Sequence, residues 1–137
     1  MKLPPEAKPP KPRRGEIWAV DLEPTEGQEI RSRKHADTDT RPALVIQRND
    51  IGDTATKVVV PITDYLPDRD VLRPWRVALG DNTTSGLSKV SCADVTQTRT
   101  LATDSTRFKR KLGQAHPAEL QATSDALARC MGATPKS

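Results

Sequence analysis

The sequence predicts a small, mainly β domain that ends in one amphipathic helix, and three observations predict this class. Several short apolar runs are separated by turn-forming residues, a pattern typical of a small barrel or sandwich. Near the C-terminus the hydrophobic period changes to the spacing of a helix. The length of 137 residues suits one domain with one modest core.

The two ends of the chain are expected to lie outside this domain. Residues 1–13 hold five prolines and no hydrophobic periodicity, which predicts a flexible tail rich in proline and lysine. The folded domain is expected over residues 14–132, with a short tail at residues 133–137. No apolar stretch approaches the roughly 20 residues that span a bilayer, and no secretory signal is seen, so we expect a cytoplasmic protein with no membrane association.

The first strands are expected on either side of a long polar segment. Residues 15–22 carry apolar groups on both faces, as in a closed or covered sheet. Residues 23–40 form a polar connection without a core pattern, and connections of this length are usually functional or disordered. Residues 41–48 and 57–63 are two hydrophobic runs joined by the turn-rich residues 49–56, which predicts a hairpin.

Three further strands are expected after a second loop. Residues 64–74 contain two prolines and several charges, so they predict a loop. Residues 75–79, 89–95 and 96–101 are short apolar or β-branched runs, and the turn formers at 83–86 precede the second of them.

The C-terminal segment has residues typical of the start and the end of a helix. Pro117 suits a first helical position, and Gly132 suits a position just past the end. One face of this helix is predicted to pack on the sheet through Leu120, Leu127, Cys130 and Met131, with Thr123 or Ser124 between them. Both cysteines, Cys92 and Cys130, are expected to be small buried hydrophobes rather than a disulfide.

Charge and composition narrow the range of partners and cofactors. The net charge of +4 is compatible with an anionic partner, and two segments expected to be loops concentrate it: Arg31, Arg33 and Lys34, and Arg107 with residues 109–111. Solvated basic loops would have the same composition. Four aromatic residues are too few for an extensive base-stacking platform. Histidine and cysteine lack metal-ligand spacing, so no metal and no cofactor is expected.

Arg41 and Thr63 are the strongest candidates for a functional pair. If the runs that contain them pair as antiparallel strands, the start of the first lies beside the end of the second, with opposite Cβ atoms roughly 5 Å apart. A guanidinium and a hydroxyl on one rim suit a phosphate under attack, which favours RNA cleavage as the leading function. Taken singly, Arg41 also fits a surface ion pair and Thr63 fits ordinary strand propensity.

Five ordered blocks of sequence add a family resemblance: RGEIWAVDLEPTEGQE, RPALVIQRND, VVVPIT, GLSKVSCADVTQTRTL and HPAELQATSDALARCMG. Together they run from about Arg14 to Gly132, and in this order the chain strongly resembles the MazF/PemK family of toxin endoribonucleases. The resemblance implies a Src-homology-3-like barrel with a C-terminal helix that acts as a homodimer. It also implies sequence-specific, metal-independent cleavage of single-stranded RNA and neutralisation by a cognate antitoxin.

The same resemblance assigns site residues. It places the catalytic residues at Arg41, immediately before Pro42, at Thr63, and at Glu29, the acidic residue after the P-T-x-G turn of the family. Gln97 matches a glutamine near the family's later strands and is expected to contact RNA. Arg31, Arg33 and Lys34 are expected to contact RNA because of their charge, and they lie among the extra residues of a loop that departs from the family pattern. The loop between Glu29 and Arg41 is longer than the family usually has, which would alter sequence preference or partner choice.

Metal-free RNA cleavage most simply uses the neighbouring 2′-hydroxyl as nucleophile, leaving a 2′,3′-cyclic phosphate and a 5′-hydroxyl. Arg41 presents a planar fork of donors to the charge that gathers on the non-bridging oxygens, and Thr63 adds a hydrogen bond. Glu29 is the expected acceptor of the 2′-hydroxyl proton. His35 and a mechanism without a dedicated side-chain base are the alternatives.

Two other functions remain open at this stage. A gyrase-poisoning toxin resembling CcdB would share the barrel, but that family relies on a tryptophan near its C-terminus and this chain has no aromatic residue after Phe108. A non-catalytic RNA- or ribosome-binding barrel would use the basic segments alone, and the juxtaposition of Arg41 and Thr63 would be incidental.

Overall fold

The computed structural model of this chain describes residues 10–23, 33–35 and 38–134. Its strands are β1 (Glu16–Val20), β2 (Arg33–His35), β3 (Thr38–Val45), β4 (Thr56–Asp64), β5 (Arg76–Leu79), β6 (Ser91–Asp94), β7 (Arg99–Ala102) and β8 (Phe108–Gln114). The other described elements are the helices α1 (Pro67–Asp70) and α2 (Pro117–Cys130) and the 3-10 turns η2 (Asn49–Ile51) and η3 (Val95–Gln97).

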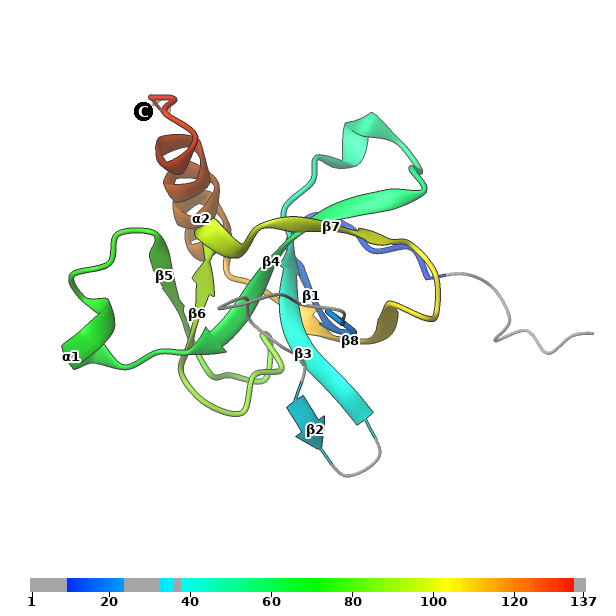
Figure 1. The fold of residues 1–137 in the computed structure, drawn as a ribbon, viewed down its shortest axis with the longest axis horizontal. Helices are drawn as coiled ribbons and strands as arrows, with labels where there is room; N and C mark the ends of the chain where they lie inside the picture. Colours follow the sequence, from blue (N-terminus) through cyan, green and yellow to red (C-terminus); the bar gives the residue numbers. More distant parts are fainter. Residues whose placement is uncertain (1–9, 24–32, 36–37, 135–137) are drawn as a thin grey trace, which may run out of the picture.

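The strands form one antiparallel sheet with the order β5-β6-β4-β3-β1-β8, in which β2 also pairs with β3 and β7 with β4. This path stays open between β5 and β8 among the described strands. The long helix α2 packs against β5 and η3 at one side of the sheet (Figure 1). The predicted class, mainly β with one C-terminal helix, is confirmed.

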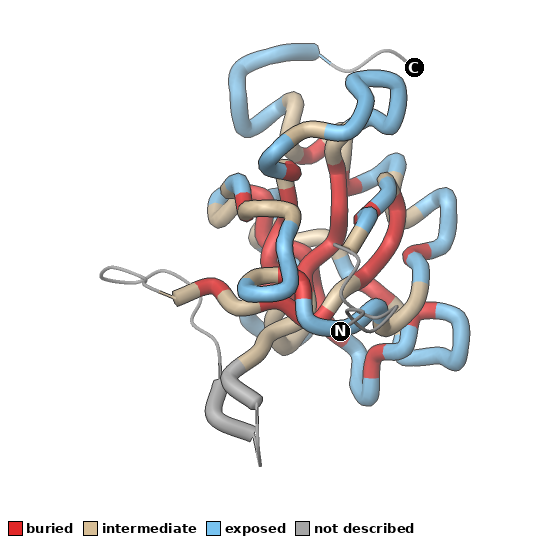
Figure 2. Tube along the Cα trace, turned by 90° about the vertical axis from the view of Figure 1, so that its right-hand side faces the viewer, coloured by how far each residue is buried: buried red, intermediate tan, exposed pale blue. Residues whose placement is uncertain are grey.

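Two apolar clusters cover the two faces of the central strands. On β1, Ile17 belongs to the cluster beneath α2, whereas Val20 belongs to the opposite cluster around Phe108. Both side chains are completely buried, and each such burial contributes about 1.5–3 kcal/mol. Trp18 meets Phe108 edge to face, with ring centroids 5.7 Å apart. Figure 2 shows the buried strand segments gathered in the middle of the molecule. The expected strand with two apolar faces is therefore confirmed.

The register of β1, β3 and β4 positions the candidate site. Ala43 lies opposite Pro61 across β3 and β4, and extending this register by two residues brings Arg41 opposite Thr63. On the other side of β3, Arg41 pairs with Val20 of β1. The predicted hairpin thus places the start of β3 beside the end of β4.

Two predicted loops are partly strand. Within the polar connection, β2 pairs with the beginning of β3, from Arg33 opposite Thr40 to His35 opposite Thr38. Backbone pairing in a hairpin needs no apolar pattern, and β-branched threonines favour it. The basic segment near residue 110 is also a strand rather than a loop. It is β8, which pairs with β1 at one end of the sheet path and exposes its charged side chains, as edge strands often do.

The helix α2 begins and ends where the sequence predicts. It starts at Pro117 after a capping box, in which His116 Nδ1 accepts a bond from the Ala118 N–H and Glu119 Oε1 accepts one from the His116 N–H. Gly132 follows its end with φ +83°. None of the helices in the described part of the chain is long and apolar enough to cross a membrane.

The packing face of α2 differs from the prediction at its last turn. Leu120 and Leu127 pack against the core, and Thr123 is completely buried. Cys130, however, is exposed and Met131 is 76% exposed, so the prediction that these two residues pack is wrong. The end of α2 projects past the sheet, so the residues that follow Leu127 at this end lie beyond the packed core (Figure 1). Cys92 is buried as predicted.

Candidate active site

A pocket of about 590 Å³ opens where β3 begins and β4 ends. It is lined by Ala19 of β1, residues 40–42 of β3, residues 62–64 of β4, the segment before β6, and Arg110 and Leu112 of β8. Strands that lie apart in sequence therefore contribute side chains to one depression. A pocket of this volume lies in the range that admits a small molecule or part of a polymer chain.

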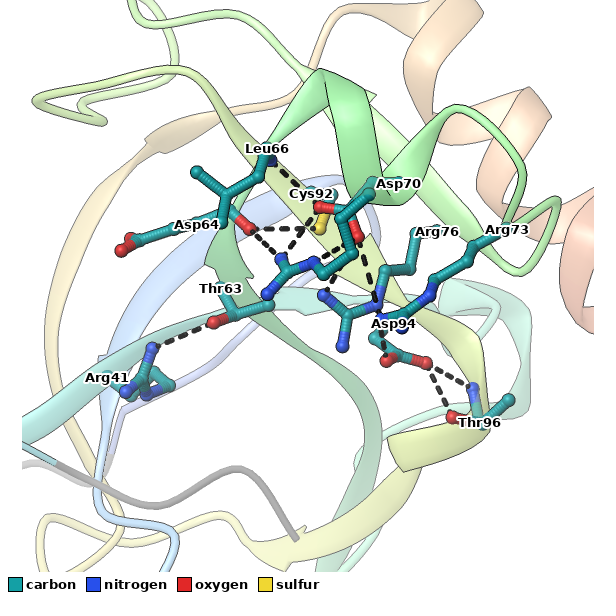
Figure 3. Close-up of polar contacts among 11 residues, drawn as sticks. Arg41, Thr63, Asp64, Leu66, Asp70, Arg73, Arg76, Cys92, Asp94 and Thr96 are labelled. Atoms are coloured by element: carbon teal, nitrogen blue, oxygen red, sulfur yellow. Dashed lines mark hydrogen bonds and ion pairs between the residues drawn. The ribbon is translucent and has the colours of Figure 1, made fainter. Parts of the chain in front are cut away.

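Arg41 and Thr63 meet inside this pocket. Arg41 Nη1 lies 3.4 Å from Thr63 Oγ1, and the two side chains point toward each other (Figure 3). This distance is long for a hydrogen bond, so an anion that accepts from both groups can replace the contact at little cost. The predicted adjacency of the guanidinium and the hydroxyl is observed.

The strands on either side hold both residues in place. Arg41 is paired with β1 through Val20, and Thr63 is paired with β6 through Cys92. Arg41 also precedes Pro42, whose ring favours an extended conformation for the residue before it. The two functional groups therefore stand on regular strands rather than on a loop, which preorganises them for a ligand.

An ion pair lies at the edge of the pocket. Asp64 Oδ1 is 2.9 Å from Lys89 Nζ, and both residues line the pocket. Of the lining residues that the structure describes, Asp64 alone carries a carboxylate, whereas Arg41, Lys89 and Arg110 carry positive charge. The described lining is therefore mainly cationic and suits an anionic ligand.

The turn before β6 forms one wall, and it depends on glycine. Gly86 lines the pocket and has φ +72°. A Cβ atom at this position would lie 2.1 Å from the carbonyl oxygen of Leu112 in β8. Only glycine allows this turn to approach β8 so closely, and the contact brings Lys89 and Arg110 to the same depression.

Behind the pocket lies a dense cluster of arginines and aspartates (Figure 3). The side chain of Asp70 in α1 is completely buried, and its oxygens accept hydrogen bonds from Arg69 Nε at 2.6 Å and from the Leu66 N–H at 2.8 Å. Arg76 Nη1 lies 3.4 Å from Asp70 Oδ1, and Arg76 Nε lies 3.1 Å from Asp94 Oδ2. The hydrogen bonds from Arg69 lower the pKa of Asp70 to about 2.

This cluster touches the strand end that carries Thr63. Arg69 Nη2 donates to the carbonyl oxygen of Asp64 at 3.1 Å, and Cys92 Sγ donates to the same oxygen at 3.6 Å. Burial raises the pKa of the Cys92 thiol to about 11. A thiol with a raised pKa stays protonated near neutrality and Cys92 is completely buried, so we assign Cys92 to the packing that supports the strand.

The other predicted site residues are less closely defined. Glu29 and Arg31 lie outside the described residues. Arg33 and Lys34 belong to β2, where they pair with Thr40 and Asp39 of β3, so their backbone follows the strand that leads to Arg41. Gln97 ends η3 and is not among the described residues that line the pocket.

The sequence interpretation assigned no site role to Lys89 or Asp64, and it named Arg110 only as part of a basic segment compatible with an anionic partner. The signal for Arg110 is the pairing of residues 108–114 with β1, which a local hydrophobic pattern does not reveal. Within the described ranges, no three side chains of His, Cys, Asp or Glu gather to hold a metal ion.

An open antiparallel sheet with one C-terminal helix and a cationic pocket at a strand end defines a small β protein suited to an anionic ligand. The family model described as "PemK-like, MazF-like toxin of type II toxin-antitoxin system" matches residues 13–131. The chain belongs to this family.

Individual relatives agree with this assignment. The chain is 36% identical to Endoribonuclease MazF9 of Mycobacterium tuberculosis (strain ATCC 25618 / H37Rv), over 84% of this chain and 92% of the relative. It superposes on MazF of Deinococcus radiodurans with a TM-score of 0.66 at 21% identity, covering 88% of this chain and 96% of the other. A mycobacterial endoribonuclease in complex with its cognate antitoxin gives a TM-score of 0.64 at 23% identity, covering 93% and 100%. The two solved structures establish the fold alone.

Proposed function

We propose that this chain is the toxin of a toxin–antitoxin system and a sequence-specific endoribonuclease that cleaves single-stranded RNA without a metal ion. The observation that carries the proposal is the contact of Arg41 with Thr63 inside the cationic pocket. Family membership and the resemblance to a relative named as an endoribonuclease support it. We assign the catalytic roles to Arg41 and Thr63, with Glu29 as a third residue.

The chemistry follows from the charges that develop during cleavage. The ribose 2′-oxygen attacks the adjacent phosphorus, a 2′-O–P bond forms, and the bond from phosphorus to the 5′-oxygen breaks. The 2′-hydroxyl proton passes to a base, and the departing 5′-oxygen takes up a proton. Arg41 stabilises the negative charge on the non-bridging oxygens with a fixed cation, and Thr63 orients the phosphate through its hydroxyl.

Glu29 remains the proposed acceptor of the 2′-hydroxyl proton. Asp64 offers a second carboxylate, because it lines the pocket directly after Thr63. A pH profile of the cleavage rate separates the two: the variant that removes the base, Glu29→Gln or Asp64→Asn, loses the acidic limb of the profile. An unchanged acidic limb in both variants supports a mechanism without a side-chain carboxylate base.

The proposed partners follow from the same charges. We propose a homodimer whose RNA contacts include Arg31, Arg33, Lys34 and Gln97. We also propose a cognate antitoxin with an acidic and apolar segment that competes with RNA for the cationic pocket, since a disordered acidic chain can fill the same groove. A mycobacterial endoribonuclease of similar fold has been solved with its cognate antitoxin, which supports the antitoxin proposal.

The test is incubation of the purified protein with a long single-stranded RNA in excess EDTA, followed by mapping of cut sites and analysis of the ends. We expect cuts at a short recurring sequence that leave 2′,3′-cyclic phosphate and 5′-hydroxyl ends. Arg41→Ala protein, prepared in parallel, controls for a contaminating nuclease. Intact RNA that is nevertheless bound would support a binding module instead, and inhibition of DNA gyrase would support a CcdB-like poison.

A further inference from the structure

The basic strand β8 contributes one of its cations to the pocket. Lys109, Arg110 and Lys111 are consecutive and exposed, but among the described lining residues only Arg110 represents this run. Lys111 instead contacts Glu16, with Nζ 3.0 Å from Oε2. The strand geometry therefore distinguishes three residues that look equivalent in the sequence.

Arg110 and Arg41 line the same pocket from the two strands that flank β1. Ala19 of β1 lies opposite Pro42 of β3 on one side and opposite Arg110 of β8 on the other. Neighbouring strands are about 4.8 Å apart, so β8 and β3 are separated by about 10 Å. Ala19 lines the pocket between them, and its single methyl group leaves the space above β1 open for a ligand.

Two arginines that line one pocket from strands about 10 Å apart suit two phosphates of one extended chain better than a single phosphate. Both present planar, forked donors that match phosphate oxygens. Resting on the RNA cleavage proposed above, we propose that Arg110 binds the phosphate next to the scissile one. The RNA strand then crosses β8, β1 and β3, with the cleaved bond at Arg41. Arg110 acts as a positioning residue, because it touches neither the nucleophile nor the leaving oxygen.

The first experiment compares Arg110→Ala with Lys109→Ala on a short RNA that contains one cut site. Arg110→Ala is expected to raise KM about 10-fold or more with little change in kcat, because it removes a contact made equally in the ground state and the transition state. The slope of log affinity against log salt should also fall by about one. Lys109→Ala removes the same charge from the neighbouring residue and is expected to change KM by less than about 2-fold.

A chemical scan identifies the phosphate that Arg110 contacts. Each phosphate of the substrate is replaced in turn by an uncharged methylphosphonate, and KM is measured with wild-type protein and both variants. A methylphosphonate at one position beside the cleaved bond should raise KM for the wild type and for Lys109→Ala. The same replacement should not raise KM further for Arg110→Ala. Such non-additivity identifies direct partners. Arg110→Lys should recover part of the affinity, because it keeps the charge without the fork.

Binding of an RNA with a 2′-deoxy nucleotide at the cut site separates this inference from the proposed function. If the wild type binds this RNA but does not cleave the normal RNA, the proposed nuclease function is wrong. The affinities of the wild type and Arg110→Ala for the 2′-deoxy RNA then still show whether Arg110 binds phosphate. If the wild type cleaves but Arg110→Ala keeps a normal KM, the assignment of Arg110 is wrong. It is also wrong if every methylphosphonate raises KM by the same factor in Arg110→Ala as in the wild type. Equal melting temperatures of the variants exclude misfolding as the cause of a lost contact.

Discussion

Two groups of arginines lie close together in this molecule and serve different purposes. In the cluster behind the pocket, Arg69 and Arg76 contact the carboxylate of Asp70 at 2.6 and 3.4 Å. In the pocket, Arg41 contacts the neutral hydroxyl of Thr63 at 3.4 Å, and Arg110 lines the same space. An arginine held on a buried carboxylate serves the fold, whereas arginines that line an open, mainly cationic pocket can contact an anionic ligand.

The two groups are nevertheless connected. Arg69 donates to both carboxylate oxygens of Asp70 and also to the backbone carbonyl of Asp64. Asp64 follows Thr63 at the end of β4. The buried cluster therefore helps to fix the position of Thr63, whose hydroxyl is proposed to take part in catalysis (Figure 3). The comparison predicts that changes in the pocket reduce the reaction rate and that changes in the cluster reduce stability.

The largest effect is expected from Arg41→Ala. The variant removes a preorganised cation from the proposed phosphate site, so single-turnover cleavage of RNA should slow by about 100- to 1000-fold. Arg41 lies at the pocket rather than in the apolar core, so the melting temperature should change little. Arg48→Ala is a matched control, because Arg48 is an exposed arginine that pairs with Asp50 away from the pocket. Cleavage by Arg41→Ala at the wild-type rate would refute the proposed mechanism.

The next effect concerns stability and is expected from Asp70→Asn. This change leaves Arg69 without its buried carboxylate and leaves Arg76 with Asp94 alone. It should lower the free energy of unfolding by about 2–3 kcal/mol near neutral pH. The surviving folded protein should cleave RNA within a few-fold of the wild-type rate. Asp68→Asn, in the same short helix but exposed, should leave stability unchanged. Urea unfolding measures both variants.

The pH dependence of this stability difference has a definite sign. The pKa of Asp70 is lowered from 3.8 to about 2 by its hydrogen bonds with Arg69. Its ionised form therefore stabilises the fold fully above pH 3.8, and the contribution is lost as the pH falls through about 2. The gap between wild type and Asp70→Asn should narrow as the pH falls from 4 toward 2. A gap that stays constant over this range would mean that the charge of Asp70 does not stabilise the fold.

The sequence predicted the pocket pair because that pair depends on local patterns. Two apolar runs and one turn fix the register of β3 and β4, and the register alone brings Arg41 beside Thr63. Helix α2 was predictable for the same reason, since Pro117 and Gly132 mark its ends locally. Each of these features is encoded within a short stretch of chain.

The features that the sequence did not reveal depend on distant partners. Strand β8 has few apolar residues among its cations, so no alternation marks it, and its strand structure depends on pairing with β1 about ninety residues earlier. Asp70 looked like one of many charges in a polar loop, yet it is buried because arginines from α1 and β5 surround it. The exposure of Cys130 depends on where the sheet ends, which no helical pattern contains.

The smallest of the three effects is expected at Thr63, and it tests whether the hydroxyl or the side-chain shape matters. Thr63→Val keeps the β-branched shape that suits a strand but removes the donor, so cleavage should slow by about 10- to 100-fold while the melting temperature stays close to wild type. Thr63→Ser keeps the hydroxyl and should recover most of the rate. Because the contact with Arg41 is long, its loss alone should cost little stability.

The double variant Arg41→Ala/Thr63→Val decides whether the two groups act on one phosphate. If they do, the second substitution should slow single-turnover cleavage much less in the absence of Arg41 than in its presence, because groups that act as a unit are not additive. Full additivity would mean that the two groups act independently. A Thr63→Val protein with the wild-type rate would assign Thr63 to the strand alone and leave Arg41 to bind the phosphate with its neighbours in the pocket.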